Sequence, residues 1–433
     1  MKQLKKMSKV ISASLALSLV LAACSDDKSE TGGTKEGGKD EKVKIVYARG
    51  KDDTQGTKAM VEAFEKKYPN IDVEFKEMPA DTGKQHAQYL TSFNANSTEM
   101  DVIDLDVIWP AEFAQAGYLM PLDRFIEKDG VKLDEYNQGA LSASKFKGKQ
   151  WALPKFIDAG MLFYRTDLVD SAKVPKTWDE LLATAKASKG QGGTEFGYLM
   201  QAKQYEGLVC NAVEFIASYG GKIIDENGEV KVNSPESVKG IKKMVEIANS
   251  DVVPANVTTF AEPESHTAFI NGQSALIRNW PYQFALANDK SQSKIVGKVG
   301  VAPLPAGDAG SAAALGGWMA GINKNTKHPE EAWTFLKFMT GAEGQKIDAI
   351  KGGHAPTLLA LYEDEEILEA NPYFKEEGFV NALEAAVSRP VAPNYPEISD
   401  IIQQQISKAI AGDITAEEAA ENMQKEISSK LVK

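Results

Sequence analysis

The stretch from Leu315 to Trp318 joins two glycines to a large aromatic side chain. Glycine has no Cβ, so adjacent glycines reach conformations with positive φ and let another molecule approach the backbone closely. A loop of this composition is suited to present backbone groups and one flat indole face to a ligand. A core tryptophan beside an ordinary turn would have the same composition, and the stretch alone does not decide between the two.

Two predicted strands end on side chains suited to binding. Asp106 closes a predicted strand at 101–106, and in open α/β sheets ligands bind beyond the carboxyl ends of the strands. A second predicted strand, 272–279, leads directly to Trp280 and Tyr282. We therefore expect a carboxylate and two aromatic rings at strand ends.

Arg389 begins a segment, 389–396, that contains three prolines. Proline fixes φ and restricts the residue before it, so this segment is expected to be an extended loop of fixed shape. The guanidinium of Arg389 is then held in place rather than free to move in solvent.

The number of cysteines, the spacing of the histidines and the net charge exclude several kinds of site and partner. The two cysteines, Cys24 and Cys210, are too few for a disulfide framework. The four histidines are scattered, and no pair has the spacing of zinc ligands. The formal net charge of −12 does not suit a nucleic-acid partner, which requires a basic surface. We expect no metal, no cofactor and no nucleic acid.

The elements that must hold these side chains alternate between strand and helix. Predicted strands at 43–49 and 71–75 flank a predicted helix at 57–67, whose apolar residues recur every four positions. A helix at 85–94 and the strand at 101–106 continue the pattern. This βαβ order predicts a parallel sheet with helices on its faces. Since single cores stop growing near about 250–300 residues, a chain of 433 residues is expected to form more than one lobe.

Three segments are predicted to connect the lobes: 151–160, 299–305 and 352–356. A helix is expected over most of 201–218, with Cys210 as a small buried residue in it.

The N-terminus has the pattern of a targeting signal. Residues 1–9 contain four lysines, and the apolar run at 10–20 is too short to span a bilayer. The sequence Leu-Ala-Ala before Cys24 resembles the lipobox of bacterial lipoproteins. That resemblance implies that residues 1–23 are removed and that Cys24 is lipidated; a plain secretory signal is the alternative. Removal would take four lysines and no acids from a net charge of −12, leaving −16.

Residues 25–42 contain no apolar side chain. Such a segment cannot bury enough surface to fold, so we expect a disordered tether after Cys24. The anchor and the tether together predict a body held at the outer face of the cell membrane.

Eight segments occur in order over nearly the whole of the remaining chain: EAFEKKYP, LDVIW, ALPKFIDAG, QYEGLVC, RNWPY, GKVGVAPLP, ALGGW and SRPVAPNYPE. In these segments the chain from about Val43 onward resembles the extracellular solute-binding proteins of ABC importers, and within them the trehalose- and maltose-binding proteins. The resemblance implies a two-lobe α/β fold of the type II periplasmic-binding kind, with three interlobe crossings and a ligand cleft. We expect one lobe at 43–153 and 304–352, and the other at 154–303 and 353–433.

The resemblance also implies roles for individual residues. Aromatic rings cover the apolar faces of sugars, while carboxylates, amides and backbone groups bond to their hydroxyls. By this comparison Trp280 and Tyr282 stack on the sugar, Trp318 stacks from the other lobe, and Gly317 offers its backbone.

Three charged side chains and one amide complete the implied ligand set. Asp106 and Asp158 accept hydrogen bonds from hydroxyls, Arg389 donates to hydroxyl or ring oxygens, and Gln55 lies at the rim. Each also has an ordinary structural interpretation: the carboxylates as caps, Arg389 as a salt-bridged residue, the aromatics as core.

Three positions depart from the family pattern. Phe156 replaces a tyrosine, Gln55 replaces a glutamate and Ala80 replaces a threonine, so the rim is expected to be less polar or less charged. These departures leave the identity of the sugar open.

The sequence therefore predicts a monomeric sugar-binding lipoprotein without enzymatic activity. It would capture a disaccharide, or a short oligosaccharide, and pass it to the ABC permease subunits in the membrane. A secreted glycosidase is the main alternative, because its site would also combine aromatics with two carboxylates. A sugar-sensing receptor accessory protein is the other.

Overall fold

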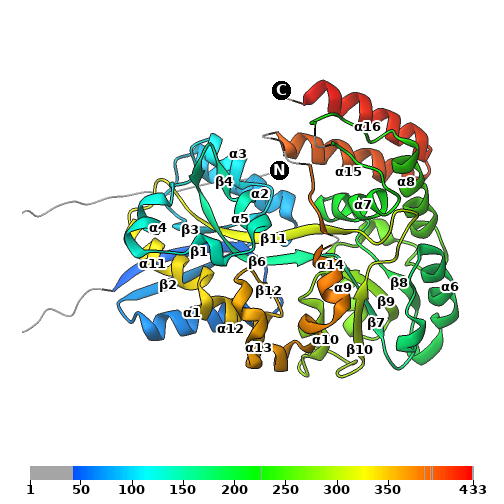
Figure 1. Ribbon diagram of the computed structural model, residues 1–433, viewed down its shortest axis with the longest axis horizontal. Coiled ribbons are helices and arrows are strands. Elements are labelled where there is room, and N and C mark those ends of the chain that lie inside the picture. Colours follow the sequence, from blue (N-terminus) through cyan, green and yellow to red (C-terminus); the bar gives the residue numbers. More distant parts are fainter. Residues whose placement is uncertain (1–41, 226, 385, 391, 393, 432–433) are drawn as a thin grey trace, which may run out of the picture. The chain divides into compact units, whose positions relative to one another are not determined.

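A computed structural model describes residues 42–431 except 226, 385, 391 and 393 (Figure 1). The predicted signal peptide at 1–23, Cys24 and the tether at 25–41 lie outside the described residues. Within the described residues, no helix is long and apolar enough to cross a membrane.

The first sheet contains the parallel strands that the sequence predicts. Its described strands run in the order β12-β6-β11-β3-β1-β2, with β13 paired to β11. Strand β1 is parallel to both β2 and β3, whereas β11 is antiparallel to β3 and β6. The bounds are β1 Val43–Gly50, β2 Ile71–Met78, β3 Val102–Asp106, β6 Ala152–Ala159, β11 Ala313–Ile322, β12 Ala355–Pro356 and β13 Ala386–Val387.

Helices with one apolar face pack against this sheet. Phe64 of α1 lies edge-on to Phe335 of α11, with ring centroids 4.9 Å apart, and Phe335 also contacts Tyr47 of β1. Edge-to-face packing of this kind adds to the burial of apolar area. The bounds are α1 Gly56–Lys67, α2 Thr82–Asn94, α3 Pro110–Gln115, α4 Asp123–Asp129, α5 Gln138–Ala143, α11 Pro329–Thr340, α12 Ala342–Gly352 and α13 Glu365–Ala370.

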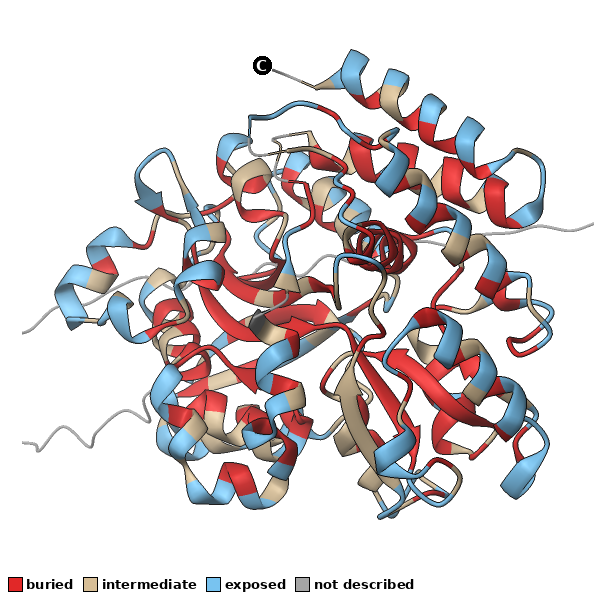
Figure 2. Ribbon diagram, turned by 45° about the vertical axis from the view of Figure 1, so that its right-hand side comes forward, coloured by how far each residue is buried: buried red, intermediate tan, exposed pale blue. Residues whose placement is uncertain are grey.

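The second sheet is smaller, with the order β10-β7-β9-β8. Only β8 and β9 are parallel in it. Most strands of both sheets are largely buried, although β10 is of intermediate exposure along its length, and most of the surrounding helices expose one side (Figure 2). The bounds are β7 Met161–Arg165, β8 Phe196–Leu199, β9 Ser274–Asn279, β10 Val299–Pro303, α6 Trp178–Ser188, α7 Glu206–Ser218, α8 Pro235–Ala248, α9 Glu262–Ile270, α10 Gln283–Asn288, α14 Glu377–Glu384, α15 Tyr395–Ala411 and α16 Ala416–Lys430. A hairpin of β4 Lys145–Phe146 and β5 Lys149–Gln150 stands apart from both sheets.

One prediction of irregular structure is wrong, and one segment predicted to connect the lobes is a strand. The stretch 315–318 is not a loop, because it lies inside β11, where Trp318 pairs with Asp106 on one side and Phe156 on the other. The predicted connector at 151–160 is largely strand β6, which leads across Gly160 into β7 of the second sheet. Both segments are flanked by partner strands, so their backbone groups are satisfied by sheet pairing despite the glycines and proline.

Strands β6 and β11 lie side by side and extend toward the second sheet (Figure 1). The predicted lobe boundary at 153/154 falls inside β6, which continues as strand to Ala159. The lobe boundaries stay a prediction, since the sheets alone do not define them.

Candidate ligand-binding site

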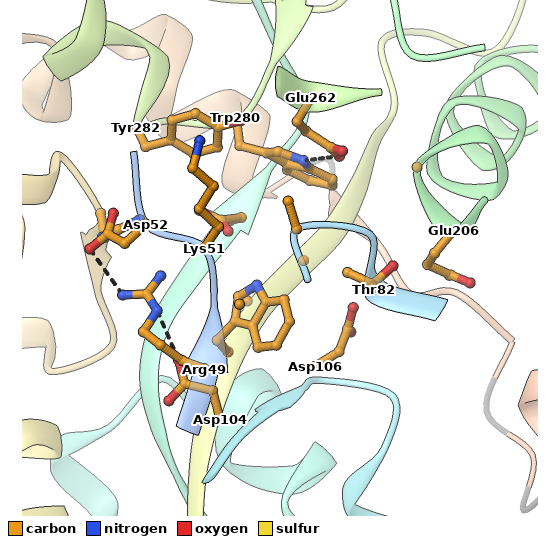
Figure 3. Close-up of a pocket in the computed structure, with 18 of the residues that line it drawn as sticks. Arg49, Lys51, Asp52, Thr82, Asp104, Asp106, Glu206, Glu262, Trp280 and Tyr282 are labelled. Atoms are coloured by element: carbon orange, nitrogen blue, oxygen red, sulfur yellow. Dashed lines mark hydrogen bonds and ion pairs between the residues drawn. The ribbon is translucent and has the colours of Figure 1, made fainter. Parts of the chain in front are cut away.

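One pocket is lined by the first sheet on one side and by residues that follow β9 and begin two helices on the other (Figure 3). It contains about 1000 Å³ of space, part of which is open to solvent. From the first sheet it takes the carboxyl ends of β1 and β3, the chain after β2, and the middle of β6 and β11. From the other side it takes the residues after β9 and the first turns of α7 and α9. Because β1, β2 and β3 are parallel, their carboxyl ends meet at the same edge, where ligands of open α/β sheets bind.

Three aromatic side chains line this pocket while keeping part of their surface exposed: Trp280, Tyr282 and Trp318. The guanidinium of Arg278 lies 3.9 Å from the ring centroid of Trp280, so one face of that indole is already covered by a cation. The indole nitrogen of Trp280 donates to Glu262 Oε1 at 3.3 Å. Trp318 rests on the edge of Trp109, with centroids 5.6 Å apart and planes at 86°. These contacts fix both indoles before any ligand arrives.

Arg389 is fixed by carboxylates from two sides. Its Nη2 donates to Asp106 Oδ1 at 2.5 Å and its Nη1 to Asp106 Oδ2 at 3.2 Å, a bidentate pair. Nη1 also donates to Glu206 Oε1 at 2.9 Å. Burial raises the pKa of Glu206, and Arg389 only partly offsets that rise. The prediction that Arg389 is held in place is confirmed, and the groups that hold it are the carboxylates of Asp106 and Glu206.

Asp158, unlike the paired carboxylates Asp106 and Glu206, has no partner within the described protein. It is 5% exposed, lines the pocket and makes no side-chain hydrogen bond or ion pair with the residues that the structure describes. Burial raises the pKa of Asp158 to about 7, with His354 acting in the opposite direction. A buried carboxyl without partners is costly, so this group is available to a ligand.

The chain after β1 forms a charged wall of the pocket. Arg49 Nη1 lies 3.3 Å from Asp52 Oδ2, and Arg49 Nε lies 3.5 Å from Asp104 Oδ2 (Figure 3). Behind it, the ammonium of Lys155 donates to Asp104 Oδ2 at 2.6 Å. Burial would raise the pKa of Asp52, but Arg49, with smaller contributions from other groups, holds it below its ordinary value. These ions are paired with one another within the protein.

Gly316 and Gly317, two of the three glycines of β11, are closely packed against neighbouring groups. A Cβ on Gly317 would lie 2.7 Å from the carbonyl oxygen of Phe156, and its φ of 136° is unfavourable for other residues. A Cβ on Gly316 would lie 3.0 Å from the Trp280 ring and 3.2 Å from Asp158 Cβ. The Gly317 carbonyl already accepts from the Val107 amide at 3.1 Å. The groups that approach the backbone of these glycines closely are neighbouring protein groups. Contact between these glycines and a ligand stays a prediction.

Seven of the eight predicted ligand residues line the pocket: Asp106, Asp158, Trp280, Tyr282, Gly317, Trp318 and Arg389. Gln55 does not line it; the residue is exposed at the N-cap of α1, and its neighbour Thr54 lines the pocket instead. Of the positions noted as departures, Ala80 and Phe156 do line it.

Sequence reasoning missed most of the polar lining: Arg49, Lys51, Asp52, Asp53, Thr54, Thr82, Gln85, Asp104, Glu206, Glu262, His266 and His354. The carboxyl-end rule that identified Asp106 applies equally to the residues after β1 and would have found the group at 49–54. Glu206, which lies in the segment QYEGLVC, and Glu262 begin helices that converge only in three dimensions, and no spacing pattern in the sequence assigns either carboxylate to the pocket.

Comparison with known proteins agrees with this architecture. Residues 48–346 match the family described as bacterial extracellular solute-binding protein. A protein of Deinococcus radiodurans named "Probable ABC transporter-binding protein" is 36% identical over 357 residues, which cover 80% of this chain and 83% of that protein.

Two solved structures share this fold at sequence identities of 39% and 26%. Maltose-bound MalE3 of T. maritima superposes with a TM-score of 0.84 at 39% identity, covering 90% of this chain and 100% of that one. The GacH receptor of Streptomyces glaucescens, solved unliganded and with acarbose, has a TM-score of 0.80 at 26% identity, covering 90% and 98%. The family match spans more than half of the chain, and the two-lobe periplasmic-binding fold predicted from sequence is confirmed. This chain belongs to the bacterial extracellular solute-binding proteins.

Proposed function

We propose that this protein captures a gluco-disaccharide, with trehalose or maltose as first choices, and delivers it to an ABC importer. The observation that carries the proposal is the set of three partly exposed aromatic rings, Trp280, Tyr282 and Trp318, around one pocket rich in hydrogen-bonding groups. Sugars require this combination, because each ring has apolar C–H faces and a rim of hydroxyls.

The charge of the pocket supports a ligand that is not an anion. Seven carboxyl groups and three Lys or Arg side chains line it. The cations are already paired: Arg49 with Asp52, Lys51 with Asp53 at 2.5 Å, and Arg389 with Asp106. An anionic sugar would therefore meet the unpartnered carboxyl group of Asp158 and no free Lys or Arg side chain among the described lining residues, which costs several kcal/mol in order of magnitude.

The relatives support a sugar and leave its identity open. The structure of MalE3 contains maltose and that of GacH contains acarbose, so related pockets hold more than one glycoside. We propose short maltodextrins and other glucosides as second choices.

We further propose that the protein acts as a monomer anchored through lipidated Cys24. The support is the succession of lysines, apolar run and lipobox in residues 1–24. The two lobes would have the boundaries expected from the sequence, with the ligand between them.

Membership of a solute-binding family argues for capture over catalysis, in agreement with the prediction that the protein is not an enzyme. Titration calorimetry with trehalose and maltose tests the proposal, followed by chromatography of the recovered sugar. We expect saturable heat from at least one of them and sugar recovered intact. Cleaved sugar would indicate a glycosidase. No heat from either, together with binding of an acidic sugar or a peptide, would refute the assignment.

A further inference from the structure

His354 lies in the pocket but does not belong to the ligand set that the family resemblance implies. It comes between α12 and β12, is 5% exposed and lines the pocket. Its Nδ1 lies 3.0 Å from Asp348 Oδ1. Its ring stacks on Phe156, with centroids 4.1 Å apart and planes at 15°. A hydrogen bond at one edge and a flat contact on one face together fix the orientation of an imidazole.

The remaining polar atom of this ring is free. His354 Nε2 has no hydrogen-bond partner among the described residues, and it is not fully enclosed by protein. Tyr282, one of the three pocket aromatics, lies with its ring centroid 6.2 Å from that of His354. The free nitrogen is therefore part of a pocket wall that also carries a candidate stacking ring.

The charges around His354 come from every element packed against it. Asp348 of α12 and Asp52 after β1 favour the imidazolium, whereas burial and Arg49 of β1 disfavour it. Lys155 and Asp158 lie on the same strand as Phe156, and the Asp158 charge interacts with that of His354. The net effect raises the pKa of His354 and lowers that of Asp348.

The position of the protons follows from this pairing. A carboxylate accepts only, so the imidazole donates its Nδ1–H to Asp348. The imidazolium carries a second proton on Nε2, and a donor on a charged group makes a stronger hydrogen bond than a neutral one.

We propose that His354 is a further specificity-determining residue, whose Nε2–H donates to one oxygen of the bound sugar. Asp348 and Phe156 are the positioning residues that hold the imidazole for this contact. The inference rests on the proposed function, because it requires a ligand with hydroxyl or ring oxygens.

The test compares variants on maltose, trehalose and their monodeoxy analogues by titration calorimetry. His354→Phe alone would leave the Asp348 carboxylate buried without its hydrogen-bond partner. This substitution is therefore combined with Asp348→Asn in a double variant. His354→Gln keeps an amide donor near the Nε2 position without a titratable ring. His328→Gln is the matched control, because His328 lies outside the pocket, before α11. Thermal unfolding checks that each variant is folded.

We expect the double variant to bind the preferred sugar about 10- to 100-fold more weakly, as for a lost hydrogen bond to a charged group. His354→Gln should recover part of this loss, and His328→Gln should match wild type. One monodeoxy sugar should bind wild type more weakly than the parent sugar yet bind the double variant as well as the parent does. That non-additivity identifies the oxygen contacted.

Two results would overturn the inference, and they are distinguishable. In the first, wild type binds the sugars, but removal of each hydroxyl weakens binding to the double variant as much as it weakens binding to wild type. His354 would then contact no ligand oxygen. If wild type gives no heat with any sugar, the proposed function fails and this inference fails with it. The Gln variant keeps the first comparison available if the double variant does not fold.

Discussion

Arg389 and Asp106 form a bidentate ion pair in the pocket wall, with both side chains less than a tenth exposed. Asp106 ends a strand of the first sheet, whereas Arg389 is held on its other side by Glu206 of α7. Tyr395 and Ser399 of α15 donate to the same Glu206 at 2.5 Å each. The carboxylate that sequence comparison assigns to a sugar hydroxyl is thus also a structural link between the two sides of the pocket.

Replacing Arg389 by Met should destabilise the ligand-free protein by about 3–5 kcal/mol, because Asp106 and Glu206 would remain buried without their cation. Urea unfolding measures this. Lys128→Met is the control, since Lys128 and Glu330 form an exposed pair 2.9 Å apart whose loss costs about 1 kcal/mol or less. Equal effects of the two changes would contradict the role assigned to the buried pair.

Trp318→Ala should weaken binding of trehalose or maltose by about 10- to 100-fold, because one stacking face is removed. Calorimetry of the folded variant measures the change. Trp151→Phe is the matched control. Trp151 donates to the Phe146 carbonyl at 2.9 Å and lies outside the pocket, so the Trp151→Phe variant should bind the sugar as tightly as wild type does. Loss of affinity in both variants alike would point to a general structural effect.

Asp158→Asn should change how stability depends on pH. The pKa of Asp158 is about 7 in the folded protein, and the ordinary value is 3.8. Between these values the folded state holds a proton that the unfolded state has lost, so this group lowers stability progressively as pH rises from about 4 to 7. The stability gained by the Asn variant should grow over that range and then level off at roughly 2–4 kcal/mol above pH 7.

Urea unfolding of ligand-free wild type and Asp158→Asn at a series of pH values measures this difference. The other titrating groups are common to both proteins, so their contributions cancel in the comparison. A difference that stays constant from pH 5 to pH 8 would show that Asp158 is not a buried, unpaired carboxyl.

Ligand binding should bring the two lobes together. The proposed contacts come from both sides of the pocket, and a ligand that makes more contacts in the closed form shifts the population toward it. Small-angle scattering should give a smaller radius of gyration with saturating sugar. An unchanged radius at full occupancy, verified by calorimetry, would argue against hinge closure near Pro154, Pro303 and Gly353.

Cys24→Ala should abolish lipid labelling in cells. The variant should remain uncleaved by the lipoprotein peptidase or appear in the medium. Cys210→Ala is the matched control, because Cys210 is 3% exposed within α7 and should not affect labelling. Persistent labelling of the Cys24 variant would mean that the lipobox resemblance is misleading.

The parallel part of the first sheet and the helix starts could be predicted because their determinants are local. Apolar periodicity placed β1, α1, β2 and α2. The strand-end rule placed Asp106 in the pocket, and the resemblance of short motifs brought six further residues to it.

Only the tertiary structure decided what those residues bond to. Leu315 to Trp318 is a strand because β3 and β6 lie on either side of it, and no local pattern indicates partners more than about 150 positions away. The pairing of Arg389 with Asp106 and Glu206, the unpartnered carboxyl of Asp158 and the Asp348–His354 contact against Phe156 depend in the same way on which elements converge. Sequence determines which chemical groups are present, whereas burial and pairing, which set their pKa values and their availability to a ligand, arise only when distant segments pack together.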